Sequence, residues 1–296
     1  MKIPPRAALA TFVLAIGWAG PLFRLAHVPF LLASGARVAI ATAILLPFFG
    51  GEAFRVLLER PRVALRAFAA GALLALHFAF WVRSLDFTTI AAATLLVTTE
   101  PLFAAALETA FLRERLPRRL VLGVVVALAG SAVACAGDFG SLGTLEGRAL
   151  LGDLLALGGS GFAAAYMVIG RSVRASMPLG GYLVLVNSVA ATLLLGASAL
   201  FGESWSVTPA TFGWLALLAL VPHLLGHGSA NVALRSYPAT VVNVAVLGEP
   251  FLASLLAFAL FDERPGVWLA LGAPLLVAGL WLAVTSAPEP APAKTR

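Results

Sequence analysis

The sequence predicts an all-α integral membrane protein in which ten transmembrane helices form two inverted five-helix repeats. Its 296 residues are 60% hydrophobic and only 11% charged, less than half of the roughly 25% charge typical of soluble domains. Apolar runs of about 20 residues, long enough to cross a hydrocarbon core of roughly 30 Å, recur from Ala7 to Val284. A motif in the middle of the chain also returns near its end. The bilayer is therefore the expected solvent for nearly the whole chain.

Charged residues, Pro and Gly divide the apolar sequence into ten expected helices. They span 7–25, 29–48, 62–83, 87–112, 117–135, 149–170, 178–200, 210–234, 238–261 and 265–285. The first helix follows Lys2 and Arg6 and so resembles a signal peptide, whose removal would leave nine helices, but no small-residue cleavage site follows it. The ten-helix interpretation is favoured on that ground. Residues 286–296 are rich in Pro and Ala, and we expect them to form a disordered cytoplasmic tail.

The distribution of positive charge predicts the orientation, because Lys and Arg near span ends favour the cytoplasm. With the N-terminus inside, fifteen of the twenty Lys and Arg residues fall on the cytoplasmic side. We therefore expect a multi-pass protein of the bacterial cytoplasmic (inner) membrane with both termini in the cytoplasm. The formal charge of +6 forms no basic stripe with interleaved aromatics, so nucleic acid is not an expected partner. A lone cysteine, Cys135, excludes an internal disulfide and a Cys-rich metal site.

The chain repeats itself at an offset of 149 residues, where 98–134 aligns with 247–283 without a gap. The aligned pairs include Glu100-Pro101 with Glu249-Pro250, Glu114-Arg115 with Glu263-Arg264, Gly123 with Gly272, and Gly130 with Gly279. We expect a first repeat over 1–135, a connecting loop over 136–148 and a second repeat over 149–285. Because each repeat holds five helices, the second enters the membrane from the opposite side. Many secondary transporters are built in this way, with the substrate site at the repeat interface.

Gene duplication also builds channels and membrane enzymes, so both remain alternatives. The sequence has no GxSxG, HExxH or DDxxD motif and no phosphate loop. This absence favours a transporter over an enzyme and predicts neither catalytic residues nor a cofactor. A channel is expected to carry rings of polar or charged residues, usually supplied by an oligomer, whereas this chain already holds a pseudo-dimer. We expect it to act as a monomer.

The two copies of the repeated motif carry a family resemblance. They read TTEPLFAAALETAFLRERL and LGEPFLASLLAFALFDERP, and with the ten-helix count they resemble the drug/metabolite transporter superfamily in its EamA-like branch. A Glu-Pro followed by Glu-Arg is most similar to bacterial amino-acid exporters of that superfamily, including the aromatic amino acid exporter. The resemblance implies a basket of ten helices around a central cavity. In chain order, the first, third, fourth, sixth, eighth and ninth of the expected helices would mainly line that cavity. The resemblance also implies export of amino acids or related small polar metabolites, although the branch includes exporters of drugs and other compounds.

Two carboxylates are expected near the middle of the membrane. Glu100 and Glu249 stand directly before Pro101 and Pro250, and a carboxylate at that depth costs at least roughly 2.5–3.5 kcal/mol unless it faces a partner or water. Each proline frees a carbonyl one turn earlier, so each Glu-Pro pair predicts a hinge. The carboxylates either contact a substrate ammonium or lock neighbouring helices together. Glu108, two turns beyond Glu100, is expected to approach the cytoplasmic interface.

Further polar and aromatic residues are expected to line the same cavity. His223, His227 and Asn231 recur every four residues and so share one helix face. Two histidines at that spacing can bind a metal, but no third ligand is evident, so a pore lining is favoured and no metal is predicted. Each aromatic residue has packing as its alternative role. The complete predicted substrate-binding set is Trp18, His77, Trp81, Glu100, Tyr166, His223, His227, Asn231 and Glu249.

Two further features concern the scaffold. Arg37 and Asn187 occupy similar places in the two halves, and for Arg37 we favour an interhelical ion pair or snorkelling over attraction of a substrate carboxylate. Small residues at helical spacing give 117–135 and 265–285 smooth faces, which predict close packing and little contribution to the cavity.

Overall fold

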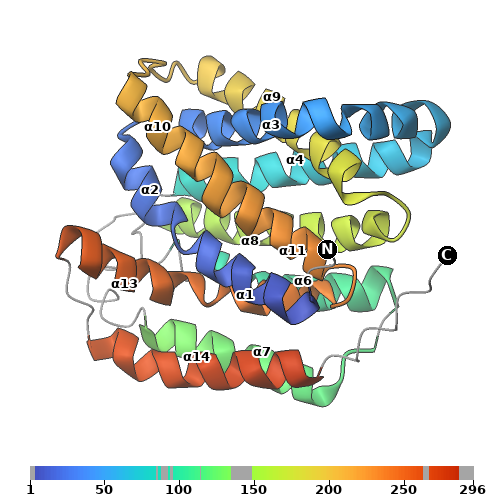
Figure 1. Ribbon diagram of the computed structural model, residues 1–296. Helices are drawn as coiled ribbons and strands as arrows, with labels where there is room; N and C mark the ends of the chain where they lie inside the picture. The colour runs from blue at the N-terminus through green and yellow to red at the C-terminus, as the bar shows by residue number, and fades with distance from the viewer. Residues whose placement is uncertain are drawn as a thin grey trace.

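The computed structural model describes residues 4–84, 86–87, 93, 96–113, 115–134, 149–262 and 267–286. Several sequence predictions fall outside these ranges: Cys135, the connecting loop 136–148, Glu114, the Glu263-Arg264 pair and the tail from 287 onward. Within the described ranges every regular element is a helix (Figure 1). Seven stretches of the described chain are long and apolar enough to cross a membrane. The chain is therefore an all-helical, multi-pass membrane protein.

The helices follow one another along the chain with short connections. They are α1 (Pro5–Ile16), α2 (Ala19–Ala26), α3 (Phe30–Glu59), α4 (Pro61–Ser84), α6 (Glu100–Phe111), α7 (Arg118–Ala134), α8 (Ala149–Arg174), α9 (Leu179–Leu200), α10 (Pro209–Leu218), the π-helix η2 (Ala219–His227), α11 (Gly228–Ala233), α12 (Ala239–Val246), α13 (Glu249–Phe261) and α14 (Val267–Ser286). Three expected helices are interrupted or irregular. The helix expected over 7–25 breaks between α1 and α2, the one over 238–261 breaks between α12 and α13, and the one over 210–234 contains η2.

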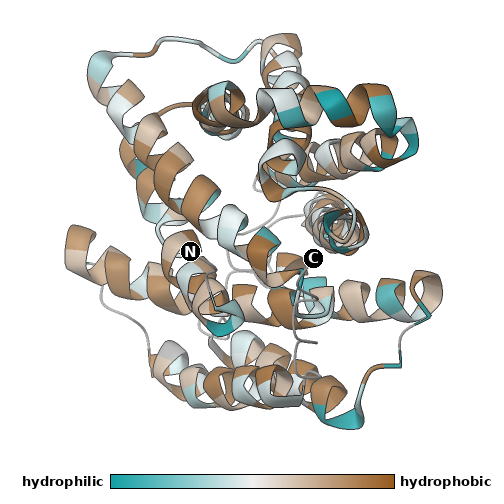
Figure 2. Cartoon of the chain, turned by 45° about the vertical axis from the view of Figure 1, so that its right-hand side comes forward, coloured by the Kyte–Doolittle hydropathy of each residue, from teal (hydrophilic) through white to brown (hydrophobic). Residues whose placement is uncertain are grey.

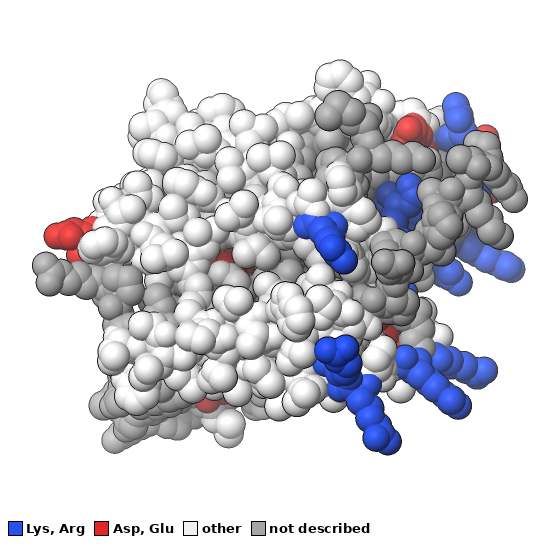
Figure 3. Space-filling view, turned by 60° about the horizontal axis from the view of Figure 1, so that its bottom comes forward, with Lys and Arg blue, Asp and Glu red and all other residues white. Residues whose placement is uncertain are grey.

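The helices form two groups with a third set between them. In Figure 1, α3, α4, α8 and α9 lie together at the top and α7 lies beside α14 at the bottom, with α1, α6 and α13 between these groups. Hydrophobic residues predominate along the helices, and hydrophilic residues gather at helix ends and in loops (Figure 2). Lys and Arg gather toward one end of the face shown in Figure 3, beside a broad surface with few charges. Large apolar side chains such as Phe48, Leu200 and Trp281 are also exposed. A surface with few charges and exposed apolar side chains is suited to contact with lipid.

The second expected helix proved longer than predicted. It was expected to end at residue 48 because Gly50, Gly51 and Glu52 follow, yet α3 continues through them to Glu59. The reason is tertiary, since Ala53 and Val56 are buried in the core of the bundle. Burial of an apolar face outweighs the roughly 1 kcal/mol by which a glycine disfavours a helix.

Helices α7 and α14 pack through their glycine faces, as the sequence predicts. A Cβ placed on Gly123 would lie 2.7 Å from the backbone nitrogen of Ala283, and one on Gly130 would lie 2.5 Å from that of Leu276. Any side chain larger than hydrogen at these positions would push the two backbones apart. The pair therefore approaches more closely than larger residues would allow, as is typical of membrane helices that associate by van der Waals contact.

Glutamates from other elements cap three helices that begin after a proline. The first N–H groups of a helix have no intrahelical partner, and Pro29, Pro178 and Pro238 at the starts of α3, α9 and α12 provide no side-chain cap. The acceptors are Glu203 for the amides of Leu31 and Leu32, Glu52 for Gly181, and Glu108 for Ala239 and Thr240. The positive end of the helix dipole favours a carboxylate at each place. These bonds tie together helix ends that are far apart in sequence.

Candidate functional site

Two helix breaks lie against each other in the middle of the bundle. The first separates α1 from α2 at Gly17, and the second separates α12 from α13 at Gly248. A Cβ on Gly17 would lie 2.7 Å from Cδ2 of Leu252 in α13, and a Cβ on Gly248 would lie 2.8 Å from Cγ1 of Val13 in α1. At both places two residues keep right-handed helical angles and form turn-type hydrogen bonds, so each helix is interrupted by a single tight turn and then continues. Interrupted helices are common beside the substrate sites of transporters.

Glu100 and Glu249 each begin a helix rather than interrupting one. They are the first residues of α6 and α13, and Pro101 and Pro250 lie in the first turn. The hinge role of the two prolines stays a prediction, and the turn at Leu247 and Gly248 falls within the four residues before Pro250, where a proline that lacks an N–H interrupts a helix. Glu100 is buried and Glu249 half-buried, and their charges interact across the bundle. In Figure 1, α6 and α13 extend from this region toward opposite ends of the molecule.

The π-helix η2 carries the two histidines of the predicted polar stripe. His223 and His227 lie with ring centroids 5.4 Å apart, and His227 meets the Phe78 ring edge-on at 5.9 Å. Asn231 continues the stripe in α11, where its amide donates hydrogen bonds to Tyr166 Oη at 2.7 Å and to the His227 carbonyl at 2.8 Å. The structure thus brings these four predicted residues together, with the two histidines on a π-helix rather than the α-helix that we expected. A π-turn widens a helix locally and is frequent at functional sites.

The predicted residues of α4 lie on its contact with α8. His77 Nδ1 is 3.0 Å from the carbonyl oxygen of Gly159, so the tautomer with a proton on Nδ1 donates to it. His77 also interacts electrostatically with His227, which connects it to the stripe on η2. Trp81 is half-buried, and its indole N–H has no acceptor among the described residues. Trp18 lies apart from these groups, packed against a smaller apolar cluster that includes Leu22, Phe23 and Leu215.

Arg37 is a central residue whose role the sequence did not indicate. Its side chain is 2% exposed, and its guanidinium carbon lies 4.1 Å from the ring centroid of Phe78 and 5.0 Å from that of Phe23. We expected an ion pair or snorkelling, but Arg37 is buried in the bundle and makes no ion pair with a described residue. Its charge acts on His77, His223 and His227. The sequence signal for Arg37 is a single charge inside an apolar run, at a place similar to that of Asn187 in the second half.

Glu108 lies where the end of α8 meets the start of α12, and its approach to the cytoplasmic interface stays a prediction. It is fully buried, forms an ion pair with Arg171 at 2.9 Å, and accepts a hydrogen bond from the Thr240 hydroxyl at 2.7 Å. Together with its caps on α12, these contacts join α6, α8 and α12. In the sequence, the repeat aligns Glu108 with Ala257, which is not acidic. This difference indicates that the role of Glu108 is confined to the first repeat.

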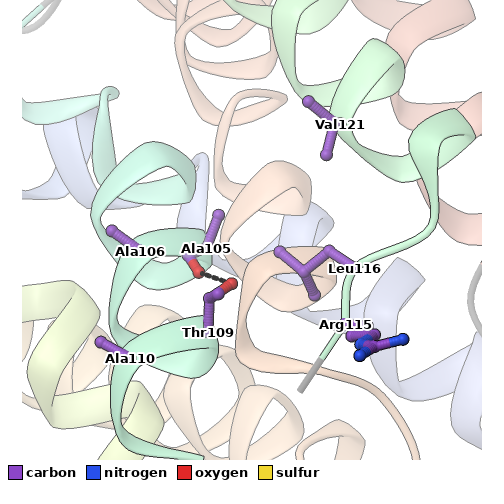
Figure 4. Close-up of a pocket in the computed structure, with 7 residues that line it drawn as sticks. All are labelled: Ala105, Ala106, Thr109, Ala110, Arg115, Leu116 and Val121. Carbon is purple, nitrogen blue, oxygen red and sulfur yellow. Dashed lines mark hydrogen bonds between the residues drawn. The ribbon is translucent and has the colours of Figure 1, made fainter. Parts of the chain in front are cut away.

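Two pockets formed by described residues lie on the outer surface, away from these residues. One holds about 690 Å³ between α6 and α7 and is lined by small residues such as Ala105 and Ala106, with Arg115 at one end (Figure 4). The other, about 700 Å³, lies along α14 beside Pro274 and Trp281. The predicted central cavity therefore stays a prediction. Among the described residues, no group of three or more His, Cys, Asp or Glu side chains is placed to hold a metal ion.

An all-helical membrane bundle with interrupted helices around buried polar side chains is a construction found in many membrane transporters. A family model described as the EamA-like transporter family matches residues 6–135 and 150–285, and the chain belongs to this family. The family and its relatives indicate a transporter rather than an enzyme.

Similar proteins include transporters from two distant organisms. The uncharacterized transporter YwfM of Bacillus subtilis (strain 168) is 27% identical over 225 residues, which are 75% of this chain and 73% of the relative. An uncharacterized transporter of Archaeoglobus fulgidus is 26% identical over 212 residues, 70% of this chain and 71% of the relative. A solved crystal structure covers 96% of this chain and 97% of its own with a TM-score of 0.82 at 19% identity, which shows a shared fold.

Proposed function

We propose that this protein is a secondary transporter that exports amino acids or related small polar metabolites across the bacterial cytoplasmic membrane. The observation that carries the proposal is the meeting of two broken helices with a buried polar cluster of Arg37, His77, His223 and His227 beside Glu249. Buried charge and broken backbone are both costly in a bilayer, and both are expected where a polar solute passes. Membership of a transporter family supports the same conclusion.

Alternating access between two inverted repeats completes the proposal. Helices α6 and α13 begin with equivalent Glu-Pro pairs and run toward opposite ends of the molecule, which supports an inverted relation between the halves (Figure 1). The two halves would then rock around a central cavity lined by the predicted substrate-binding residues. We place both termini in the cytoplasm because the positive residues favour that orientation, and we expect one chain to form the transport unit.

Counterflow in proteoliposomes tests this function. Proteoliposomes that contain the purified protein are loaded with each of the twenty amino acids in turn. They should take up the same labelled amino acid faster than protein-free liposomes do. The uptake rate should saturate as the external amino-acid concentration rises, because a carrier has a finite number of sites. A flux that rises linearly with concentration would indicate a channel instead. Uptake of none of the twenty by folded protein would contradict amino-acid export.

A paired glutamate substitution tests the site within that assay. Glu100→Gln replaces the buried carboxyl group at the start of α6 with an amide, and loss of a charge-assisted contact between that carboxyl group and the substrate, worth roughly 1.5–3 kcal/mol, should slow counterflow about 10–100-fold. The matched control is Glu59→Gln at the exposed end of α3, which should keep the wild-type rate. Equal rates for the two folded variants would remove Glu100 from the pathway.

A further inference from the structure

Arg37 carries a buried charge that no described residue neutralises by direct contact. Its Nε atom has no hydrogen-bond partner, and none of the described acids forms an ion pair with it. The faces of Phe78 and Phe23 hold the guanidinium plane, which supplies some stabilisation through cation–π attraction but leaves the N–H donors free. A buried charge without a hydrogen-bonded partner is strongly destabilising. Such a group is retained where a ligand supplies the missing anion.

Glu249 is the acid that acts on this arginine from a distance. The Coulombic attraction of Glu249 reaches Arg37, yet the two side chains do not approach within the 4.0 Å that defines an ion pair. Glu249 sits at the first turn of α13, directly after the break, while Arg37 projects from the unbroken α3. Gly248, directly before Glu249, lies against Val13 of α1, and the neighbouring Phe12 contacts His227. His227 in turn meets Phe78, whose ring lies under the Arg37 guanidinium. Glu249 and Arg37 therefore approach one interior group of residues from α13 and α3 without forming an ion pair.

A zwitterion fits this arrangement. An α-amino acid carries a carboxylate and an ammonium on one carbon, so it can bridge an arginine and a glutamate that lie too far apart to pair directly. The planar guanidinium suits bidentate binding of a carboxylate. His223 and His227 lie beside the pair, and the rings of Phe78 and Phe12 that contact His227 provide apolar surface.

We propose that Arg37 binds the carboxylate, and Glu249 the ammonium, of a zwitterionic α-amino acid in the central site. This inference rests on the proposed function and names its substrate class: both charged groups of the substrate are required. A compound that lacks either group leaves one buried protein charge unpaired, which is the strongest way for a site to reject a ligand.

The test compares three ligands in counterflow on each variant: an amino acid that the wild-type protein transports, the amine formed by removing its carboxylate, and its N-acetyl derivative. The wild-type protein should favour the amino acid over the other two by about 10–100-fold, the value of one charge-assisted contact. Arg37→Gln should slow the amino acid to the rate of the amine and leave the amine unchanged. Glu249→Gln should slow the amino acid to the rate of the N-acetyl derivative and leave the rate of that derivative unchanged.

The matched control is Arg83→Gln, an exposed arginine at the end of α4 that pairs with Asp86, and its ligand preference should equal that of the wild type. Counterflow of amino acids with an unchanged carboxylate preference in Arg37→Gln would overturn this inference alone. Uptake of no amino acid by the wild-type protein would instead contradict the proposed function. Where Arg37→Gln yields no folded protein, thermal stabilisation of the wild type decides: the amino acid should stabilise it more than the amine does, and equal stabilisation would overturn the proposal.

Discussion

At the scale of single residues, the molecule uses buried charge in two distinct ways. Glu108 is saturated, because an arginine, two backbone amides and a hydroxyl all bind its carboxylate. Arg37 forms no ion pair with a described residue, lies against the Phe78 and Phe23 rings, and is attracted by the more distant Glu249. The contacts of Glu108 hold helices together, whereas the guanidinium of Arg37 keeps a hydrogen-bond donor, Nε–H, without an acceptor among the described residues. Burial alone therefore does not separate a structural charge from a functional one, whereas the number of partners does.

The saturated glutamate predicts a large loss of stability on substitution. Glu108→Gln removes the charge that pairs with Arg171 and caps α12, and breaking a buried ion pair by removing one partner costs roughly 3–5 kcal/mol. Thermal unfolding of the purified protein in detergent should therefore begin at a markedly lower temperature. Glu59→Gln, which changes an exposed glutamate of α3, should leave the transition in place. Coincident transitions for both variants would show that the contacts of Glu108 contribute little.

At the scale of elements, helix ends and helix faces are stabilised by partners distant in the chain. Glu52 of α3 caps the start of α9, while Glu203, just beyond α9, caps the start of α3. This reciprocal exchange holds the antiparallel α3 and α9 in register at both ends. The α7 and α14 pair has no comparable polar bonds at its glycine contacts and depends on close backbone approach instead.

The glycine contacts predict which helix substitutions are tolerated. Gly130→Leu should sharply lower the yield of folded protein, because the new side chain would overlap the α14 backbone at Leu276. Gly196→Leu is the matched control, since nothing lies within 4 Å of a Cβ at that position on α9. Gel-filtration profiles of the two variants should differ accordingly. A normal profile with altered substrate preference for Gly130→Leu would place α7 in the transport pathway rather than in the scaffold.

At the scale of the whole molecule, the bundle separates a pair of packed scaffold helices from the set that contains the breaks. α7 and α14 lie together along one side (Figure 1). α1 contacts α12, and it also contacts η2 and α13, the elements that carry His223, His227 and Glu249. The two interrupted helices meet where Gly17 lies against Leu252 and Gly248 lies against Val13, and Gly226 of η2 lies beside Ala15 and Ile16 of α1. Glycine at these positions allows the interrupted helices to approach closely.

The inverted arrangement of the two halves predicts opposite accessibility for equivalent residues. In a Cys135→Ala background, cysteine at position 115 should react with an impermeant label from the cytoplasm, and cysteine at position 264 should react from outside. The reason is that five helices per repeat reverse the second repeat across the membrane. Labelling of intact cells compared with inverted vesicles provides the measurement. Reaction of both positions from the same side would rule out the inverted arrangement.

Properties that depend on residue type and spacing could be read from the sequence. The membrane environment, the all-helical fold, the small-residue faces of α7 and α14 and the equivalent Glu-Pro pairs follow from hydrophobicity, side-chain volume and repetition along the chain. The grouping of His223, His227 and Asn231 was also predicted, because residues four apart lie on one side of a helix even where that helix widens into a π-turn.

Properties that depend on which helices meet were decided by the tertiary structure. Proline predicted a hinge beside Glu100 and Glu249, and at both places the structure has a short turn before a helix that starts at the glutamate. Glycines predicted an end to α3 that burial of Ala53 and Val56 overrides. Glu108 and Arg37 look alike in sequence, as single charges within apolar runs. In the packed bundle Glu108 has an ion pair and three hydrogen bonds, whereas Arg37 has no ion pair with a described residue. The groups that surround a buried charge determine its role, and they depend on which helices pack together.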